Sequence, residues 1–186
     1  MRPIRVKPTR LDIDLADDIS RYTRLAPEKI AKALTWGADE HVLCAVAGGW
    51  WLYCQLSGTR QRESSHVLLT TVVSAMAPHV LKAAFNQTRP DRRTIIGHLR
   101  GVPLSGKRSD AFPSGHAVHI GALASAASIM PEKQRNAVWA VAAGLSATRI
   151  VVLAHWTTDV LAGLAVGCAI ERGLRWITGY GPAAKR

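Results

Sequence analysis

Five apolar runs separated by charged segments constrain the fold of this chain more than any other feature. Each run approaches the length of about twenty mostly apolar residues that a helix needs to cross a bilayer, although several are rich in Ala and Gly. The runs occupy residues 38–56, 66–81, 114–131, 137–154 and 160–177. They predict an all-α fold, an integral membrane helical bundle of about five transmembrane helices. A soluble bundle with buried, Ala-rich helices is the alternative.

The segments outside these runs predict three parts. Residues 1–10 contain two prolines and four basic residues, which predicts a disordered basic tail. From Leu11 to Leu25 apolar residues recur at helical spacing, so an amphipathic helix should lie on the membrane surface or pack on the domain. Pro27 begins a second short helix that runs to Trp36. The expected parts are a basic tail with amphipathic interfacial helices (residues 1–37), a transmembrane domain (38–178) and a C-terminal tail (179–186).

The charge distribution favours a membrane protein over a nucleic-acid binder. The chain has 24 Lys and Arg against 13 Asp and Glu, a formal net charge of +11, yet 48% of it is hydrophobic. The basic residues lie between apolar runs, not along one helix, and aromatic residues are not interleaved with them. We therefore expect a membrane as partner and no nucleic acid.

One segment places ionisable residues inside apolar surroundings. The sequence T-R-I-V-V-L-A-H-W-T-T-D, from Thr148 to Asp159, contains Arg149 and His155. An unpaired charge there costs on the order of several kcal/mol, so each residue needs a partner or a ligand. Asp159 follows His155 by one helical turn, so its carboxylate could accept the Nδ1 proton and leave the other ring nitrogen free to attack or to coordinate. The same spacing would also suit a buried pair without function.

Arg149 and His155 would face different sides of one ideal helix, because they are six residues apart. If both belong to one site, either the helix ends between them or the site collects them from its rim.

Two further segments have the same character. The range Lys82–Pro90 reads K-A-A-F-N-Q-T-R-P, and Pro113–His116 reads P-S-G-H before an apolar run. Ser114, Gly115 and His116 should therefore occupy the first turn of a helix, where free N–H groups and the helix dipole favour an anion. Glycine also lets the backbone come close to a ligand. This predicts a phosphate cradle with a histidine attached.

The ordered pattern K-x6-R-P, P-S-G-H and R-x5-H-x3-D resembles the type-2 phosphatidic acid phosphatase superfamily. That superfamily includes membrane lipid phosphatases, soluble bacterial acid phosphatases and vanadium haloperoxidases. The resemblance covers roughly Lys82 to Asp159, and three matched pieces in order are far more specific than any one of them. Thr148 stands where many members have Ser, and it keeps the hydroxyl group. The layout of the chain looks like the short bacterial membrane members.

The resemblance implies a metal-independent phosphatase that works through a phosphohistidine. His155 would be the nucleophile and Asp159 would orient it, while His116 would protonate the leaving group and then activate water. The phosphoryl oxygens would be held by Lys82, Arg89, Ser114, Gly115 and Arg149. We expect no metal and no cofactor, because cationic side chains and a helix terminus surround the phosphoryl group and no acidic cluster lies near the motifs.

The resemblance also implies an anionic lipid phosphate or diphosphate as substrate. Candidates are a polyprenyl diphosphate or monophosphate, phosphatidic acid, phosphatidylglycerol phosphate and lipid A, and the layout slightly favours a polyprenyl lipid. The resemblance implies a multi-pass protein of the inner (plasma) membrane with its active site facing the periplasm. The positive-inside rule predicts the opposite orientation, because the face that holds the N-terminus and the three motifs has more basic residues than the other face. The alternatives are a vanadium-dependent haloperoxidase and a non-enzymatic protein that binds anionic lipid. The sequence does not indicate an oligomeric state.

Overall fold

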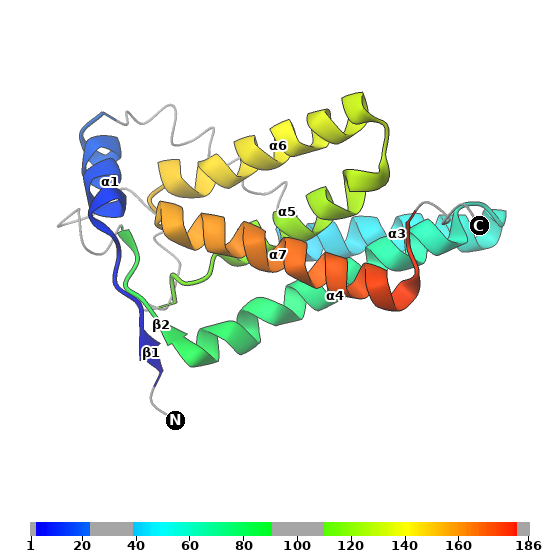
Figure 1. The fold of residues 1–186 in the computed structure, drawn as a ribbon, viewed down its shortest axis with the longest axis horizontal. Helices are drawn as coiled ribbons and strands as arrows, with labels where there is room; N and C mark the ends of the chain where they lie inside the picture. Colours follow the sequence, from blue (N-terminus) through cyan, green and yellow to red (C-terminus); the bar gives the residue numbers. More distant parts are fainter. Residues whose placement is uncertain (1–2, 23–38, 91–109, 182–186) are drawn as a thin grey trace.

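The computed structural model describes residues 3–22, 39–90 and 110–181 and shows a bundle of helices (Figure 1). The predicted all-α fold is confirmed, since the described strands are two residues long. The predicted helix from Pro27 to Trp36 and most of the basic segment that follows Arg89 lie outside the described residues. The elements are β1 (Ile4–Arg5), α1 (Arg10–Tyr22), α3 (Glu40–Ser57), α4 (Gln61–Ala84), β2 (Phe85–Asn86), α5 (Gly115–Ala126), the 3-10 helix η3 (Ala127–Ile129), α6 (Glu132–Val151) and α7 (Thr157–Thr178).

Local signals define where several helices begin and end. Asp39 caps α3, because its Oδ1 accepts hydrogen bonds from the N–H groups of His41 and Val42 at 3.0 and 3.3 Å. Gly58 ends α3 with φ of 69° and Gly179 ends α7 with φ of 63°, a conformation that glycine adopts without strain. The Asp39 cap fixes the start of α3, which lies beside the cavity described below.

Helix α5 is the centre of the bundle and packs against α4, α6 and α7. The contact with α7 depends on glycines, because a Cβ atom at Gly163 would lie 2.6 Å from the carbonyl oxygen of Ser114, and one at Gly167 would overlap the carbonyl oxygen of Val118. Two small residues one turn apart on a helix allow this close helix packing. The contact brings the N-terminus of α7 beside the N-terminus of α5.

Replacing Gly167 with Ala is expected to destabilise the bundle. The added Cβ would meet backbone atoms of α5, including the amide nitrogen of Ala122 at 2.6 Å, and backbone cannot move aside without separating the two helices. Overpacking of this kind costs about 1–3 kcal/mol. Thermal unfolding in detergent measures the loss. Gly173→Ala is the matched control on the same helix, since nothing lies within 4 Å of its added Cβ, and an equal melting temperature for the two variants would contradict the prediction.

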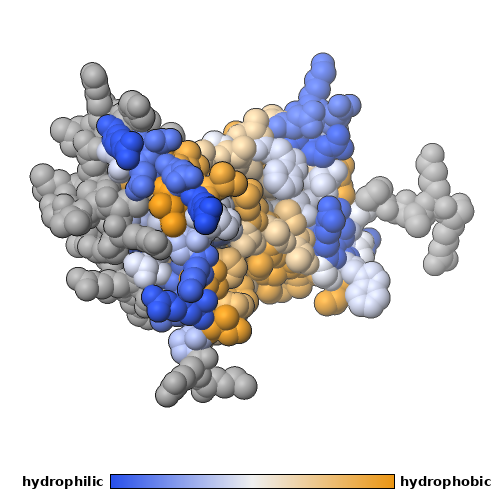
Figure 2. Space-filling model, turned by 60° about the vertical axis from the view of Figure 1, so that its left-hand side comes forward, coloured by the Kyte–Doolittle hydropathy of each residue, from blue (hydrophilic) through white to orange (hydrophobic). Residues whose placement is uncertain are grey.

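On the face shown in Figure 2, hydrophobic side chains form a band across the middle of the bundle, between hydrophilic ends. Exposed apolar residues of four helices contribute to the apolar surface: Val46, Leu52, Leu69, Val72, Met76, Val141 and Leu161. A continuous apolar surface of this kind fits a lipid environment. Among the described helices α4 alone is long and apolar enough to be a candidate span by length and composition, so the expected five crossings stay a prediction.

The acidic residue inside the last apolar run is paired within the bundle. Glu171 of α7 is fully buried, and its Oε1 accepts hydrogen bonds from Nε2 of His66 at 3.1 Å and Nε of Arg175 at 2.8 Å. Ser125 of α5 donates to the other carboxylate oxygen. The carboxylate therefore faces the bundle interior, where partners compensate its charge.

Residues 3–10 are not the disordered tail that the composition of this segment predicts. Ile4 and Arg5 pair in parallel with Phe85 and Asn86, so β1 and β2 form a two-stranded sheet at the end of α4 (Figure 1). Basic, proline-containing sequence is disordered only where no partner strand exists. Here the chain just after α4 provides that partner, a contact between residues about eighty positions apart that local composition does not reveal.

Helix α1 packs on the domain, one of the two arrangements that its amphipathic pattern allowed. Asp12 is 2% exposed and accepts hydrogen bonds from the N–H and the hydroxyl group of Thr158 at 3.0 and 2.8 Å. Hydrogen bonds from Thr158 and Thr9 hold the pKa of Asp12 below its usual value, even though burial acts to raise it. Ala16 packs with Trp156. These contacts hold α1 against the first turn of α7, which also contains Asp159.

Candidate active site

A cavity of about 220 Å³ lies at the N-terminus of α5 and collects most of the residues singled out from the sequence. Its lining includes six of the eight candidate site residues: Lys82, Arg89, Gly115, His116, Arg149 and His155. Ser114 and Asp159 are fully buried beside it. Further lining comes from Asp39, Glu40, Pro78, His79 and His119. The three sequence motifs therefore meet in one place.

A tight turn places Arg149 and His155 in the same cavity. Helix α6 ends at Val151, Leu153 has a positive φ of 54°, and the N–H groups of Ala154 and His155 both bond back to the carbonyl of Arg149. One of the two expected solutions, a helix that ends between the arginine and the histidine, is confirmed. Without that turn the two side chains would face different sides of a helix.

His155 is 3% exposed, and its Nδ1 lies 2.7 Å from the carbonyl oxygen of Ala111. A carbonyl only accepts, so Nδ1 carries the proton and Nε2 keeps its lone pair. Burial lowers the pKa of His155 well below its ordinary value, and the positive charges of Arg89, Arg149 and Lys82 lower it further. The ring is therefore neutral, with a nucleophilic nitrogen available in a cationic cavity.

The expected hydrogen bond between His155 and Asp159 is wrong in its detail. The nearest carboxylate oxygen of Asp159 is 3.7 Å from Nδ1, and it instead accepts a hydrogen bond of 2.9 Å from the N–H of Trp156. The prediction assumed that both residues lie on one helix, but α7 begins only at Thr157 and Asp159 caps its first turn. The carbonyl oxygen of Ala111, which the spacing of residues could not identify, accepts the hydrogen bond from Nδ1. Burial raises the pKa of Asp159 to about 7, and in its ionised form the carboxylate is close enough to stabilise a protonated His155.

The segment after α4 and the segment before α5 pair with each other next to His155. Gln87 pairs with Asp110, and the N–H of Ala111 donates to the carbonyl of Gln87 at 3.1 Å. The indole of Trp156 donates to the carbonyl of Thr88 at 2.8 Å. The chain after α4, the chain before α5 and the turn before α7 are thereby held together, which positions the Ala111 carbonyl.

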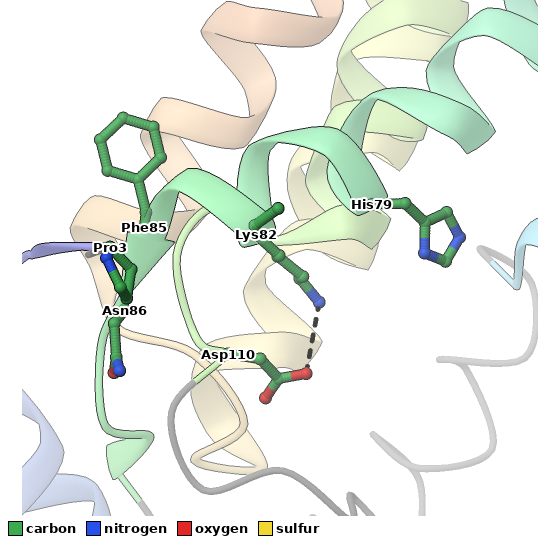
Figure 3. A pocket seen from close by; sticks show the side chains of 7 residues that line it. Pro3, His79, Lys82, Phe85, Asn86 and Asp110 are labelled. Carbon is green, nitrogen blue, oxygen red and sulfur yellow. Dashed lines mark ion pairs between the residues drawn. The ribbon is translucent and has the colours of Figure 1, made fainter. Parts of the chain in front are cut away.

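Asp110 is a site residue that the sequence analysis did not single out. Its Oδ1 accepts from Nε of Arg89 at 2.9 Å, and its Oδ2 lies 3.6 Å from Nζ of Lys82 (Figure 3). Although burial acts to raise the pKa of Asp110, the hydrogen bond and charge of Arg89 and the charge of Lys82 hold it below the usual value. The sequence signal that could have identified Asp110 is its position as an acidic residue just before P-S-G-H, in a mainly basic stretch. Asp110 fixes two cations of the site in one orientation.

Lys82 also lines a second hollow of about 460 Å³, formed with Pro3, His79, Ala83, Phe85, Asn86 and Asp110 (Figure 3). None of the histidines that the motifs predict as catalytic lines this hollow. The smaller cavity, not the larger one, therefore contains the predicted chemistry.

Arg149 differs from the other cations because it has no acidic partner among the described residues. It is 7% exposed, and its buried Nε has no hydrogen-bond partner in this part of the chain. A buried guanidinium without a counter-ion is costly unless an anion occupies the cavity. Its planar donors suit the oxygens of a phosphoryl group.

The first turn of α5 faces the same cavity. Ser114 caps the helix by accepting from the N–H of Ala117 at 3.4 Å, and its own N–H donates to the carbonyl of Asp159 at 3.2 Å. Gly115 and His116 follow and line the cavity. The N–H groups of a first helical turn have no acceptor within the helix, so they add anion-binding donors to the cations.

This helical bundle thus contains a small cavity with a neutral histidine, three cations and a helix N-terminus, a combination that suits the binding of a phosphate group. Comparison with known families agrees. The PAP2 superfamily model matches residues 64–181, and the chain belongs to that superfamily.

Two curated relatives are lipid A 1-phosphatases, from Rhizobium johnstonii and Rhizobium etli. Each is 36% identical over 104 residues, which cover 55% of this chain. The match spans 43% and 45% of the length of those relatives, so the chain corresponds to less than half of each.

Two solved structures share the fold. Aquifex aeolicus LpxE superposes with a TM-score of 0.73 at 17% identity, over 92% of this chain and 98% of that one. The transmembrane PAP2-type phosphatidylglycerolphosphate phosphatase of Bacillus subtilis superposes with a TM-score of 0.68 at 17% identity, over 94% and 88%. The predicted fold class, a helical bundle of the membrane type, is confirmed by these matches, and a membrane location is supported.

Proposed function

We propose that this chain is a metal-independent lipid phosphatase that hydrolyses a phosphomonoester or diphosphate through a phosphohistidine. The observation that carries the proposal is the buried Arg149, which lacks an acidic partner among the described residues and lines one cavity with the neutral His155. A cation without a counter-ion next to a nucleophilic nitrogen suits an anionic substrate that the nitrogen attacks. The relatives and the apolar surface band support a lipid as the carrier of that phosphate.

The proposed first step breaks the bond between phosphorus and the leaving oxygen. Arg149, Arg89 and Lys82 hold the phosphoryl oxygens, together with N–H groups of the first turn of α5. Nε2 of His155 attacks phosphorus in line with the leaving oxygen, and His116 gives that oxygen its proton. The lipid alcohol or lipid monophosphate departs, and the phosphoryl group remains on His155.

In the second step His116 removes a proton from a water molecule. The hydroxide attacks phosphorus, the bond to Nε2 breaks, and inorganic phosphate is released. Ala111 and Asp159 stabilise the positive form of His155 during both steps, the first through the Nδ1 hydrogen bond and the second through its charge. No step needs a metal ion or a cofactor.

Phosphate release by the detergent-purified protein tests the proposal. We expect release from at least one of phosphatidic acid, phosphatidylglycerol phosphate, undecaprenyl diphosphate and lipid A, unchanged by EDTA and inhibited competitively by vanadate. Vanadate should compete because it occupies the cationic cavity in place of the phosphoryl group. Sensitivity to EDTA would contradict the metal-independent mechanism. Halide oxidation that depends on peroxide, without phosphate release, would identify the haloperoxidase alternative instead.

We also propose that the chain spans the inner membrane with the cavity facing the periplasm, as the family resemblance suggests. An Asp39→Cys variant without the three native cysteines would report the orientation through a thiol reagent that does not cross membranes. Labelling in intact spheroplasts is the expected result, and labelling only after lysis would place the cavity in the cytoplasm.

A further inference from the structure

The lining of the active cavity includes hydrogen-bond acceptors as well as cations. Glu40 lies in the first turn of α3 and His119 lies on α5, one turn after His116, and both line the cavity. His119 is 1% exposed, whereas the Glu40 side chain is 38% exposed. A carboxylate in a phosphate-binding cavity opposes anion binding, so its position calls for another role.

The hydrogen bonds of His119 determine which of its nitrogens carries the proton. Ser74 donates its hydroxyl proton to the carbonyl of Thr71 at 3.0 Å, so its oxygen accepts from Nδ1 of His119 at 3.1 Å. Nε2 of His119 is then an acceptor. It is buried and has no hydrogen-bond partner among the described residues.

The two acceptors face one another at a distance that suits a donor between them. Nε2 of His119 lies 3.9 Å from Oε2 of Glu40, beyond the range of a direct hydrogen bond. A hydroxyl or N–H group placed beside both atoms could reach each of them at about 3 Å. The phosphoryl-binding side chains line the same cavity of about 220 Å³, so the donor would belong to a group attached close to the phosphate.

We propose that Glu40 and His119 bind a hydrogen-bond donor on the leaving alcohol of the substrate. The proposal rests on the phosphatase function above and adds the substrate class: lipid phosphates whose alcohol carries a hydroxyl or N–H group near the ester bond. A sugar phosphate such as lipid A and a glycerol phosphate such as phosphatidylglycerol phosphate both carry such a donor. Phosphatidic acid and polyprenyl phosphates do not.

The test compares kcat/KM on these four lipids for the full-length protein in detergent micelles. The wild type should prefer the two donor-bearing lipids by about 10-fold or more, the value of a hydrogen bond to a charged group. Glu40→Ala should lose about 10-fold on those two lipids, whereas the rates on phosphatidic acid and undecaprenyl phosphate should not fall, because there the variant only removes a charge that opposes anion binding. Glu40→Gln, which keeps an acceptor oxygen, should retain part of the preference. Lipid A and phosphatidylglycerol phosphate, compared with each other, separate a sugar from a glycerol as the preferred alcohol.

Two further variants make the outcome specific. Glu63→Ala, which removes another first-turn acid outside this cavity, should leave all four rates unchanged. His119→Phe should repeat the selective loss; Glu40→Ala decides the matter alone if this core variant does not fold. Equal losses on all four lipids, or a wild type without preference, would overturn the inference and leave the phosphatase function intact. Absence of phosphate release that depends on His155 would instead contradict that function.

Discussion

His155→Ala should reduce phosphate release by at least about 10³-fold, because it removes the nitrogen that attacks phosphorus in the proposed mechanism and that lies among the phosphoryl-binding cations. The Nδ1 bond to Ala111 leaves Nε2 as the attacking atom, and alanine removes it without adding bulk. The measurement is turnover of the best lipid substrate by purified protein, with enough enzyme to detect a 10⁴-fold lower rate.

His41→Ala is a suitable control for that experiment. His41 follows Glu40 on α3, is 88% exposed and does not line the cavity, so its loss should leave the rate within about twofold. A phosphorylated enzyme trapped by rapid alkaline denaturation from the wild type, and missing from His155→Ala, would support the phosphohistidine, whose P–N bond is stable in alkali. Substantial turnover by His155→Ala would remove it from the nucleophile role.

His116→Ala should slow the reaction by about 10²-fold to 10⁴-fold, with the loss depending on the leaving group. His116 lies in the first turn of α5 and lines the cavity beside Gly115, where it can reach the leaving oxygen. A soluble aryl phosphate with a low-pKa phenol needs little proton donation, so its rate of enzyme phosphorylation should fall least. The slope of rate against leaving-group pKa measures this difference.

The comparison within one variant is its own control, because a general folding defect would lower every rate equally. His79→Ala tests the specificity of the effect further, since His79 lines the same cavity but belongs to no motif. An unchanged slope in His116→Ala would exclude this residue as the acid that protonates the leaving group.

Several parts of the site could be predicted from local sequence because their physics is local. P-S-G-H before an apolar run implies a helix start with Ser114 as cap and His116 in the first turn, and the structure has both. Gly163 and Gly167 are one turn apart, so their shared face on a helix follows from periodicity alone. The ordered motifs also identified the cations that line the cavity.

Other features depend on contacts between distant segments, which no spacing rule encodes. Asp159 was expected to hold Nδ1 of His155 because the two are four residues apart, but the chain turns at Leu153 before α7 begins. The carbonyl of Ala111, forty-four residues away, occupies that place. Asp110 reaches Arg89 and Lys82 through the same loop pairing.

The sequence alone determined the helical class, the superfamily and the residue types of the site, because apolar runs, helix starts and motif order are properties of short segments. Only the tertiary structure decided which atoms face one another. It paired residues 4–5 with the end of α4, it replaced the Asp159 hydrogen bond with one to Ala111, and it set Glu40 opposite His119. Each of these contacts joins segments that the chain itself keeps far apart, so it exists only in the packed structure.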